Sequence, residues 1–224
     1  MIVRKITALL LVLVTALSLF SCGKDKGKEK DREYDEAEVL AAAAELVERS
    51  LPINELLYGR GLEYSDEGVG VYKKASAESI ESFGFSTVDQ MKEEIRAIFA
   101  TSLADSMINS DVFSSIKVDD VIVGYTRYYQ STDEDGNPNG IMVKSDYDYP
   151  LKNSYTYSDS FAVADVEGEV IVVRALVTVT REDGVVKNEN LDIRMIEEVS
   201  GWRLLTPTYV VYNKYTEIYD NLNK

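Results

Sequence analysis

The sequence predicts an α+β domain in which N-terminal helices pack on a curved antiparallel sheet. Apolar residues recur at helical spacing between residues 33 and 108, and from Val118 onward they alternate with a period of two. The predicted strands are joined by short turns, which indicates antiparallel neighbours. With 45% apolar and 28% charged residues, the chain has the composition of a folded protein rather than a disordered one.

The helical part begins with an Ala- and Glu-rich segment from Glu33 to Ser50. Pro52 lacks an N–H, so we expect it to interrupt this helix and leave a short second segment that ends at Gly59 and Gly61. Residues 66–70 are expected to form a loop. The apolar stripe of the first helix consists of Val39, Leu40, Ala43, Ala44, Leu46 and Val47.

Two capping signals mark the next helices. Ser76 is a candidate N-cap for a short helix through Phe83. Thr87 and Gln90 have the spacing of a capping box, which predicts a longer helix from there to about Ile108. Its apolar residues share one face, so we expect it to cover a sheet on one side: Val88, Met91, Ile95, Ile98, Phe99 and Leu103.

Six strands are predicted after the helices, and Gly-, Pro- and Asn-containing turns separate them. The strand beginning at Glu169 carries apolar residues on both faces, so we place it centrally in an antiparallel meander. The predicted strands are Val118–Gln130, Gly140–Tyr149, Tyr155–Val166, Glu169–Arg181, Val185–Val199 and Trp202–Tyr212.

Composition excludes several function classes. The chain has no histidine and one cysteine, which removes Ser-His-Asp and Cys-His catalysis, histidine-ligated metals and intrachain disulfides. Its net charge of −15 argues against nucleic acid as a partner, because phosphate binding needs clustered positive charge. No Gly-rich phosphate loop follows a strand, and we expect no cofactor.

The first 22 residues read as a targeting segment. Arg4 and Lys5 precede the uncharged run from Ile6 to Phe20, which has the length of a signal-peptide core. The run ends in Leu19-Phe20-Ser21-Cys22, which resembles the lipobox of bacterial lipoproteins. This resemblance implies that residues 1–21 are a lipoprotein signal peptide, and that Cys22 becomes a lipidated N-terminus on the extracytoplasmic side of the cell membrane.

A charged segment separates this anchor from the domain. Residues 22–32 contain the lipidated Cys22 and the sequence GKDKGKEKDR, which has little to bury and is expected to be a flexible tether. Because the first 32 residues carry four net positive charges, the single domain of residues 33–224 has a net charge of −19. A basic tether is attracted to anionic headgroups, whereas the acidic domain is repelled by them, although the segment also fits a simple soluble spacer.

The order of elements resembles the NTF2-like cone fold, with Gly201-Trp202-Arg203-Leu204 opening a late strand. Residues 54–61 (NELLYGRG) also resemble a stretch of uncharacterised small bacterial lipoproteins. The NTF2-like resemblance implies a concave sheet face that a helix covers and that can enclose a pocket. That family includes enzymes, ligand binders and assembly modules, so the fold does not select the function.

One motif has the spacing of a calcium loop. Asp135, Asn137, Asn139, Gly140 and Asp146 match D-x-N-x-N-G-x5-D. An EF-hand needs flanking helices, whereas the flanks here alternate like strands. A hairpin loop is therefore the favoured interpretation, and this set is a weak metal candidate.

Tyrosines and two strand arginines are the candidate ligand-binding residues. Tyrosine on a sheet can stack on sugar rings or support a protein contact, although it also suits half-buried strands. Arg174 and Arg194 lie within otherwise apolar strands and need an acidic partner or an anionic ligand if they point into the concave face. The tyrosines are Tyr125, Tyr128, Tyr147, Tyr149, Tyr155 and Tyr157.

These observations favour a lipid-anchored, non-enzymatic envelope protein that binds a protein partner or a small ligand through the sheet face. The alternatives are an enzyme that uses carboxylates or tyrosine on cell-wall glycans, and an acidic inhibitor of a basic cell-wall hydrolase. A deep pocket with a desolvated carboxylate beside tyrosine or arginine favours the enzyme.

The anchor is testable by replacing its only thiol. Cys22→Ala removes the acceptor of the lipid, so the protein is expected to leave the membrane fraction, because two acyl chains supply the lasting attachment. Fractionation and mass spectrometry of the mature N-terminus check this. A variant that is cleaved and still remains membrane-bound contradicts the thioether.

Overall fold

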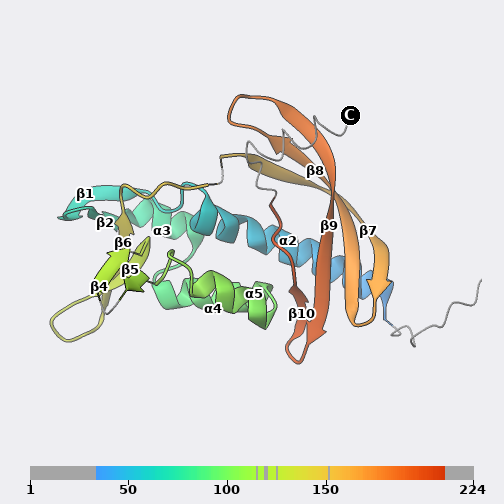
Figure 1. The fold of residues 1–224 in the computed structure, drawn as a ribbon, viewed down its shortest axis with the longest axis horizontal. Helices are drawn as coiled ribbons and strands as arrows, with labels where there is room; N and C mark the ends of the chain where they lie inside the picture. Colours follow the sequence, from blue (N-terminus) through green and yellow to red (C-terminus); the bar gives the residue numbers. More distant parts are fainter. Residues whose placement is uncertain (1–33, 115, 119–120, 125, 151, 210–224) are drawn as a thin grey trace, which may run out of the picture. The chain divides into compact units, whose positions relative to one another are not determined.

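The computed structural model describes residues 34–114, 116–118, 121–124, 126–150 and 152–209, and it is an α+β structure of helices and antiparallel sheets, in which a hairpin at residues 64–75 separates the first described helix from the next (Figure 1). The predicted fold class is therefore confirmed at this level. Cys22, the tether and Tyr125 lie outside the described residues. No helix in the described ranges is both long and apolar enough to cross a membrane.

Helix α2 (Glu36–Tyr58) runs through Pro52 without a break, so the predicted interruption is wrong. Asp35 caps its start by accepting hydrogen bonds from the N–H groups of Ala37 and Glu38. Pro52 and Glu48, whose carbonyl loses its donor, are both exposed, so water can take the missing place. The buried stripe continues past the proline and outweighs its cost: Val39, Ala43, Leu46, Val47, Ile53, Leu56 and Leu57.

The capping predictions are confirmed. Ser76 caps α3 (Ala77–Phe83), and Gly84 ends it in the left-handed conformation. Thr87 and Gln90 form the capping box of α4 (Val88–Ile98).

The predicted continuation of α4 to Ile108 is wrong, because the chain breaks and restarts as α5 (Thr101–Ile108). At the break the Ala100 N–H donates to the Leu204 carbonyl at 2.9 Å, and Phe99 forms a parallel bridge with Leu204. Pairing with a strand replaces helical hydrogen bonds at this point.

The strands form two four-stranded antiparallel sheets and a hairpin, not the single curved sheet expected. The first sheet has the order β1-β2-β6-β5, so residues 66–70, predicted as a loop, belong to the β1–β2 hairpin. The second has the order β10-β9-β8-β7 and is the predicted meander. The strands are β1 (Tyr64–Val69), β2 (Tyr72–Ala75), β3 (Ile116–Val118), β4 (Val121–Gly124), β5 (Tyr128–Thr132), β6 (Pro138–Lys144), β7 (Ser154–Glu167), β8 (Val170–Thr180), β9 (Val186–Glu198) and β10 (Gly201–Leu204).

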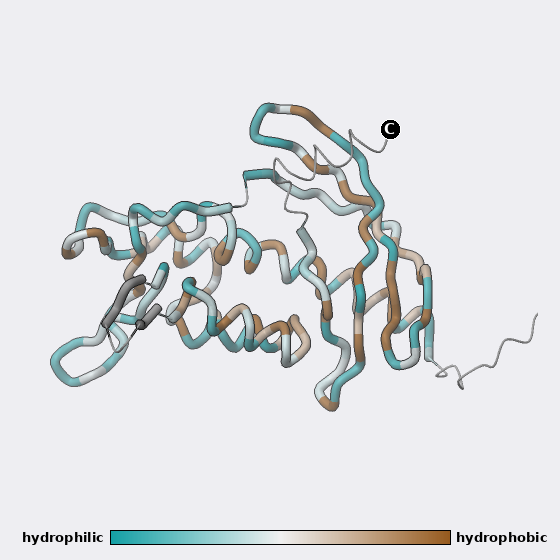
Figure 2. Tube along the Cα trace, in the orientation of Figure 1, coloured by the Kyte–Doolittle hydropathy of each residue, from teal (hydrophilic) through white to brown (hydrophobic). Residues whose placement is uncertain are grey.

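Strand β8 lies between β7 and β9, as predicted, and its core-facing row is almost completely buried. Helices α2 and α4 contact this second sheet, and α4 also contacts β5 of the first. The turn between β5 and β6 is coloured hydrophilic, in keeping with its exposure (Figure 2). The core row of β8 is Ile171, Val173, Ala175, Val177 and Val179.

A buried polar cluster fastens the segment after β10 to α2. Thr208 is fully buried, and its Oγ1 accepts a hydrogen bond from Asn54 Nδ2 at 2.8 Å and also pairs with Ser50 Oγ. Its carbonyl accepts from the Tyr157 hydroxyl at 2.5 Å. The following ring, Tyr209, packs on Tyr58 with centroids 4.6 Å apart.

Thr208→Val is expected to lower the free energy of unfolding by about 1–3 kcal/mol, because it leaves the buried Asn54 Nδ2 without its acceptor and takes one of two partners from Ser50, which keeps its hydrogen bond to the Val47 carbonyl. Urea unfolding measures this. The matched control is Thr178→Val, whose hydroxyl bonds the exposed Asn188, and it should cost less than about 0.5 kcal/mol. Equal losses in the two variants contradict a stabilising role for the cluster.

Candidate functional site

The most unusual side chain in the described part of the chain is Arg127, which is only 2% exposed. It directly precedes β5, where its N–H donates to the Asp111 carbonyl and its own carbonyl accepts from the Lys144 N–H. The backbone is therefore held on both sides, and the side chain points inward. Buried arginine is rare because removing its charge from water is costly.

The guanidinium lies at the C-terminal end of α2. Nη2 donates to the carbonyls of Gly59 at 2.7 Å and Arg60 at 2.5 Å. A helix ends with partial negative charge on its carbonyls, and the last turn of α2 contains no basic residue of its own. Arg127 supplies that positive charge from a distant part of the sequence.

The rest of the guanidinium is only partly satisfied. Of its five N–H groups two are used by Nη2, so about three remain on Nε and Nη1, and neither atom has a hydrogen-bond partner. Among the described residues no carboxylate forms an ion pair with Arg127. Its Cζ lies 5.1 Å from the ring centroid of Tyr128 and 4.6 Å from that of Tyr147, and these π-faces stabilise the cation without neutralising it.

The two tyrosines are hydrogen-bond donors in this environment. The Tyr128 hydroxyl accepts from the Leu62 N–H at 3.2 Å and donates to the Leu56 carbonyl at 3.1 Å. Burial raises the pKa of Tyr128 to about 12. Burial also raises the pKa of Tyr147, and the nearby Asp111 carboxylate adds to this. Both phenols therefore keep their protons at neutral pH.

Gly61 makes the close approach possible. Its φ of 71° is in the left-handed region, and a Cβ there would overlap the Tyr128 hydroxyl and the Arg127 Nη2. The NELLYGRG stretch is thus the end of a helix followed by a glycine turn that closes around a buried cation. Its first residue, Asn54, belongs to the Thr208 cluster.

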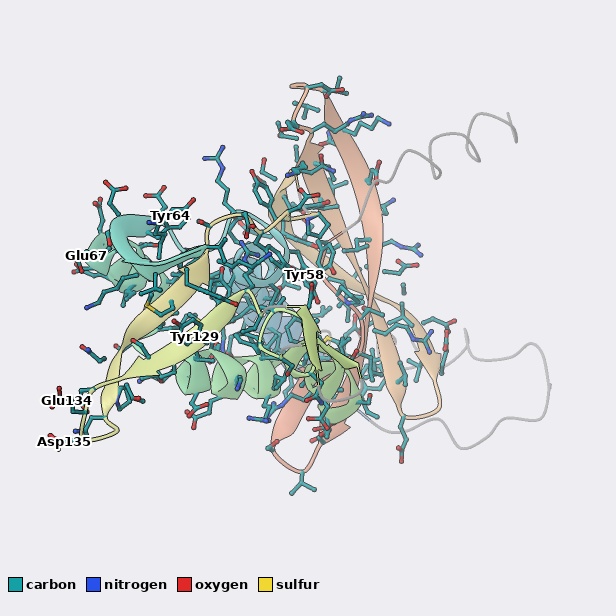
Figure 3. The ribbon with its side chains drawn as sticks, turned by 60° about the vertical axis from the view of Figure 1, so that its left-hand side comes forward. Tyr58, Tyr64, Glu67, Tyr129, Glu134 and Asp135 are labelled. Carbon is teal, nitrogen blue, oxygen red and sulfur yellow. The ribbon has the colours of Figure 1, made fainter. Side chains whose placement is uncertain are left out.

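A cleft of about 420 Å³ opens beside Arg127, and we call it the Arg127 cleft. Its volume falls within the range of small-molecule sites. Three cations and one carboxylate line it in a domain that is otherwise strongly acidic. Figure 3 labels Tyr64, which lies on β1 at this cleft. The lining includes Arg60, Glu63, Tyr64, Arg127, Lys144, Tyr147 and Tyr149.

The structure brings three of the predicted tyrosines to this region. Tyr128 packs under Arg127, whereas Tyr147 and Tyr149 line the cleft. The prediction that Tyr147 and Tyr149 lie on a strand is wrong, because β6 ends at Lys144. The chain leaves the strand at Ser145, whose N–H and hydroxyl both donate to the Val71 carbonyl.

Tyr155 and Tyr157 lie elsewhere. They share a face of β7, as predicted, and line a separate groove of about 540 Å³ with residues of α2. Burial raises the pKa of Tyr157, whose hydroxyl donates a hydrogen bond to the Thr208 carbonyl.

Arg174 and Arg194 lie outside the cleft and already have acidic partners. Arg174 forms two hydrogen bonds with Asp192, at 2.6 and 2.7 Å, and holds the pKa of that carboxyl below its usual range. Arg194 Nη2 lies 2.6 Å from Glu167. Both pairs are on the exposed face of the second sheet, so these arginines do not combine into an anion site.

The residues of the calcium motif are not brought together. Asp133, which the motif does not use, shapes the turn by accepting from the N–H groups of Asp135 and Asn137. Asp146 follows the opposite end of β6, roughly 20 Å away along the strand, and pairs with Lys144 at 3.1 Å. Figure 3 shows Asp135 at the tip of the hairpin.

The sequence analysis missed Arg127, although the criterion that selected Arg174 and Arg194 applies to it equally. Arg127 falls inside the long predicted strand Val118–Gln130, whereas the structure has the separate strands β3, β4 and β5 in this region. The paired glycines of NELLYGRG were the only local sign that a large group approaches the backbone there. No protein-family model matches this chain, and no curated protein matches it.

Gly61→Ala is expected to destabilise the domain by about 3 kcal/mol or more, since it combines a left-handed backbone with overlap on Arg127 and Tyr128. Gly70→Ala is the matched control, because its φ is 61° and nothing lies within 4 Å of the added Cβ. The control should lose about 1–2 kcal/mol. Denaturant unfolding that finds the same loss at both positions contradicts the steric role of Gly61.

Proposed function

We propose that this chain is a lipid-anchored protein of the cell envelope, held on the extracytoplasmic side through Cys22, which binds a small anionic ligand in the Arg127 cleft. The observation that carries the ligand class is the buried guanidinium with unpaired N–H groups at Nε and Nη1. Both nitrogens are themselves buried, so an anion satisfies the hydrogen-bond donors and the charge once the side chains that cover them move aside. The anchor rests on the lipobox resemblance alone.

The lining of the cleft supports an anion over a cation or an apolar ligand. Arg60 makes no ion pair with any described residue, and it contributes a second charge at the rim. The Tyr147 phenol at the cleft keeps its proton, because burial raises its pKa. Because the domain carries −19 overall, a local group of cations is the exception that a ligand of opposite charge would exploit.

Binding fits these groups better than catalysis. A tyrosine base or nucleophile needs a lowered pKa, whereas burial raises the pKa of Tyr128 and Tyr147. Inhibition of a basic hydrolase has only the charge of the domain in its favour. A sheet-face partner would have to compete with the ion pairs of Arg174 and Arg194.

For the fold we propose a relationship to the NTF2-like cone. The antiparallel β7–β10 sheet, with α2 and α4 in contact with it, supports this. The separate β1-β2-β6-β5 sheet is the feature that departs from a single cone.

The anion site is testable with acetate as the probe and the full-length chain in detergent micelles. Calorimetry or NMR titration is expected to give a dissociation constant of about 1 mM, typical of a small ion held by a few charged contacts. Arg127→Met should abolish binding. Arg60→Gln should weaken it about fivefold because it removes only a rim charge.

Arg96→Gln is the matched control, since Arg96 is an exposed arginine on α4 outside the cleft, and it should leave acetate binding unchanged. If Arg127→Met fails to fold, the comparison of Arg60→Gln with Arg96→Gln still tests the proposal. No acetate binding, or equal effects of the Arg60 and Arg96 variants, contradicts the proposal.

A further inference from the structure

A second cavity adjoins the Arg127 cleft, and we call it the annex. It has a volume of about 360 Å³. Arg60 and Tyr149 line both cavities, so the two cavities are neighbours on the protein surface. A ligand larger than a simple anion can therefore begin in the cleft and extend past these two side chains into the annex.

The chemistry changes from the cleft to the annex. Cations outnumber carboxylates by three to one in the cleft, whereas the annex sets Arg60, Lys152 and Arg181 against Glu55 and Glu182. Two of these cations already have acidic partners, Lys152 with Asp148 and Arg181 with Asp183, so a second negative charge in the annex would meet two carboxylates without a matching gain from the cations. Hydroxyl groups would not be repelled, because they donate to carboxylates and accept from cations. The annex therefore suits a neutral, hydroxyl-rich group.

Neutral polar side chains in the annex support the same reading. Asn153, Ser154 and Thr180 line it, and each can both donate and accept. Such a mixed set satisfies hydroxyl groups in either direction. An alkyl chain would leave this set unsatisfied.

Tyr149 stands at the junction and presents an aromatic face. Lys152 Nζ lies 3.4 Å from its ring centroid, so the lysine holds the ring and covers one side of it. An amphipathic ring of this kind packs against the C–H face of a sugar while its hydroxyl stays wet. Its position places that platform directly after the anion-binding end.

We propose that the ligand is an acidic saccharide, with the sugar carboxylate in the Arg127 cleft and a neutral sugar in the annex. This inference rests on the proposed function, since it needs the anion site. It adds the substrate class: one negative charge at one end, a ring over Tyr149, and hydroxyl groups beyond it.

The test compares four probes on the full-length chain in detergent micelles by calorimetry: acetate, succinate, glucuronic acid, and the disaccharide of glucuronic acid linked to N-acetylglucosamine. Glucuronic acid is expected to bind at least tenfold more tightly than acetate, and the disaccharide more tightly again. Succinate should gain nothing over acetate, because its second charge meets Glu55 and Glu182.

Tyr149→Ala should remove most of the gain of the sugars, so that the ratio of sugar affinity to acetate affinity within this variant falls toward one. Tyr129→Ala is the matched control, because Tyr129 is an exposed tyrosine on β5 that does not line either cavity. It should leave all four affinities unchanged. An unchanged ratio of sugar to acetate affinity in Tyr149→Ala, or an equal effect of both variants, overturns the assignment of Tyr149.

Two failures are distinguishable. If acetate binds and the sugars show no gain, or if succinate binds most tightly, the saccharide is wrong and the anion site stands. If none of the four probes binds, the anion site and the saccharide both fail.

Discussion

The structure of this domain depends on one buried positive charge at the end of a helix. Arg127 donates to the carbonyls of Gly59 and Arg60, where α2 would otherwise end with no cation. Those carbonyls recover part of the free energy that burial of the guanidinium costs. The same contact joins the start of β5 to the end of α2, and so places the first sheet against the long helix.

The Gly59 and Arg60 carbonyls do not recover the whole free energy of burying the guanidinium, and the N–H groups left unpaired determine the chemistry of the site. Two π-faces stabilise the cation, but they cannot accept its free N–H groups. The neighbouring phenols hold their protons because burial disfavours their charged forms. A cluster made mostly of donors suits recognition of an anion, and this supports the proposed binding role.

The two sheets have different roles: the second forms most of the strand core, and the first carries residues of the candidate site. The second sheet supplies most of the buried strand residues, and its exposed face carries ion pairs between its own strands. These pairs give Arg174 and Arg194 acidic partners. The first sheet, although smaller, delivers Arg127, Lys144 and the following Tyr147 and Tyr149 to the end of α2. The candidate site therefore lies on the part of the fold whose strand pairing is least local.

Local chemistry by itself determined the caps at Ser76 and Thr87, the alternation of β8 and its central place, since these depend on neighbours a few residues apart. Only tertiary structure decided that α2 continues through Pro52, because burial of its distant stripe outweighs the lost hydrogen bond. Tertiary structure also paired β6 with β2 and placed Arg127 at Gly59, 68 residues away in the sequence. Alternation shows that a side chain can point inward, but the partner it meets there is set by packing between elements far apart in the chain.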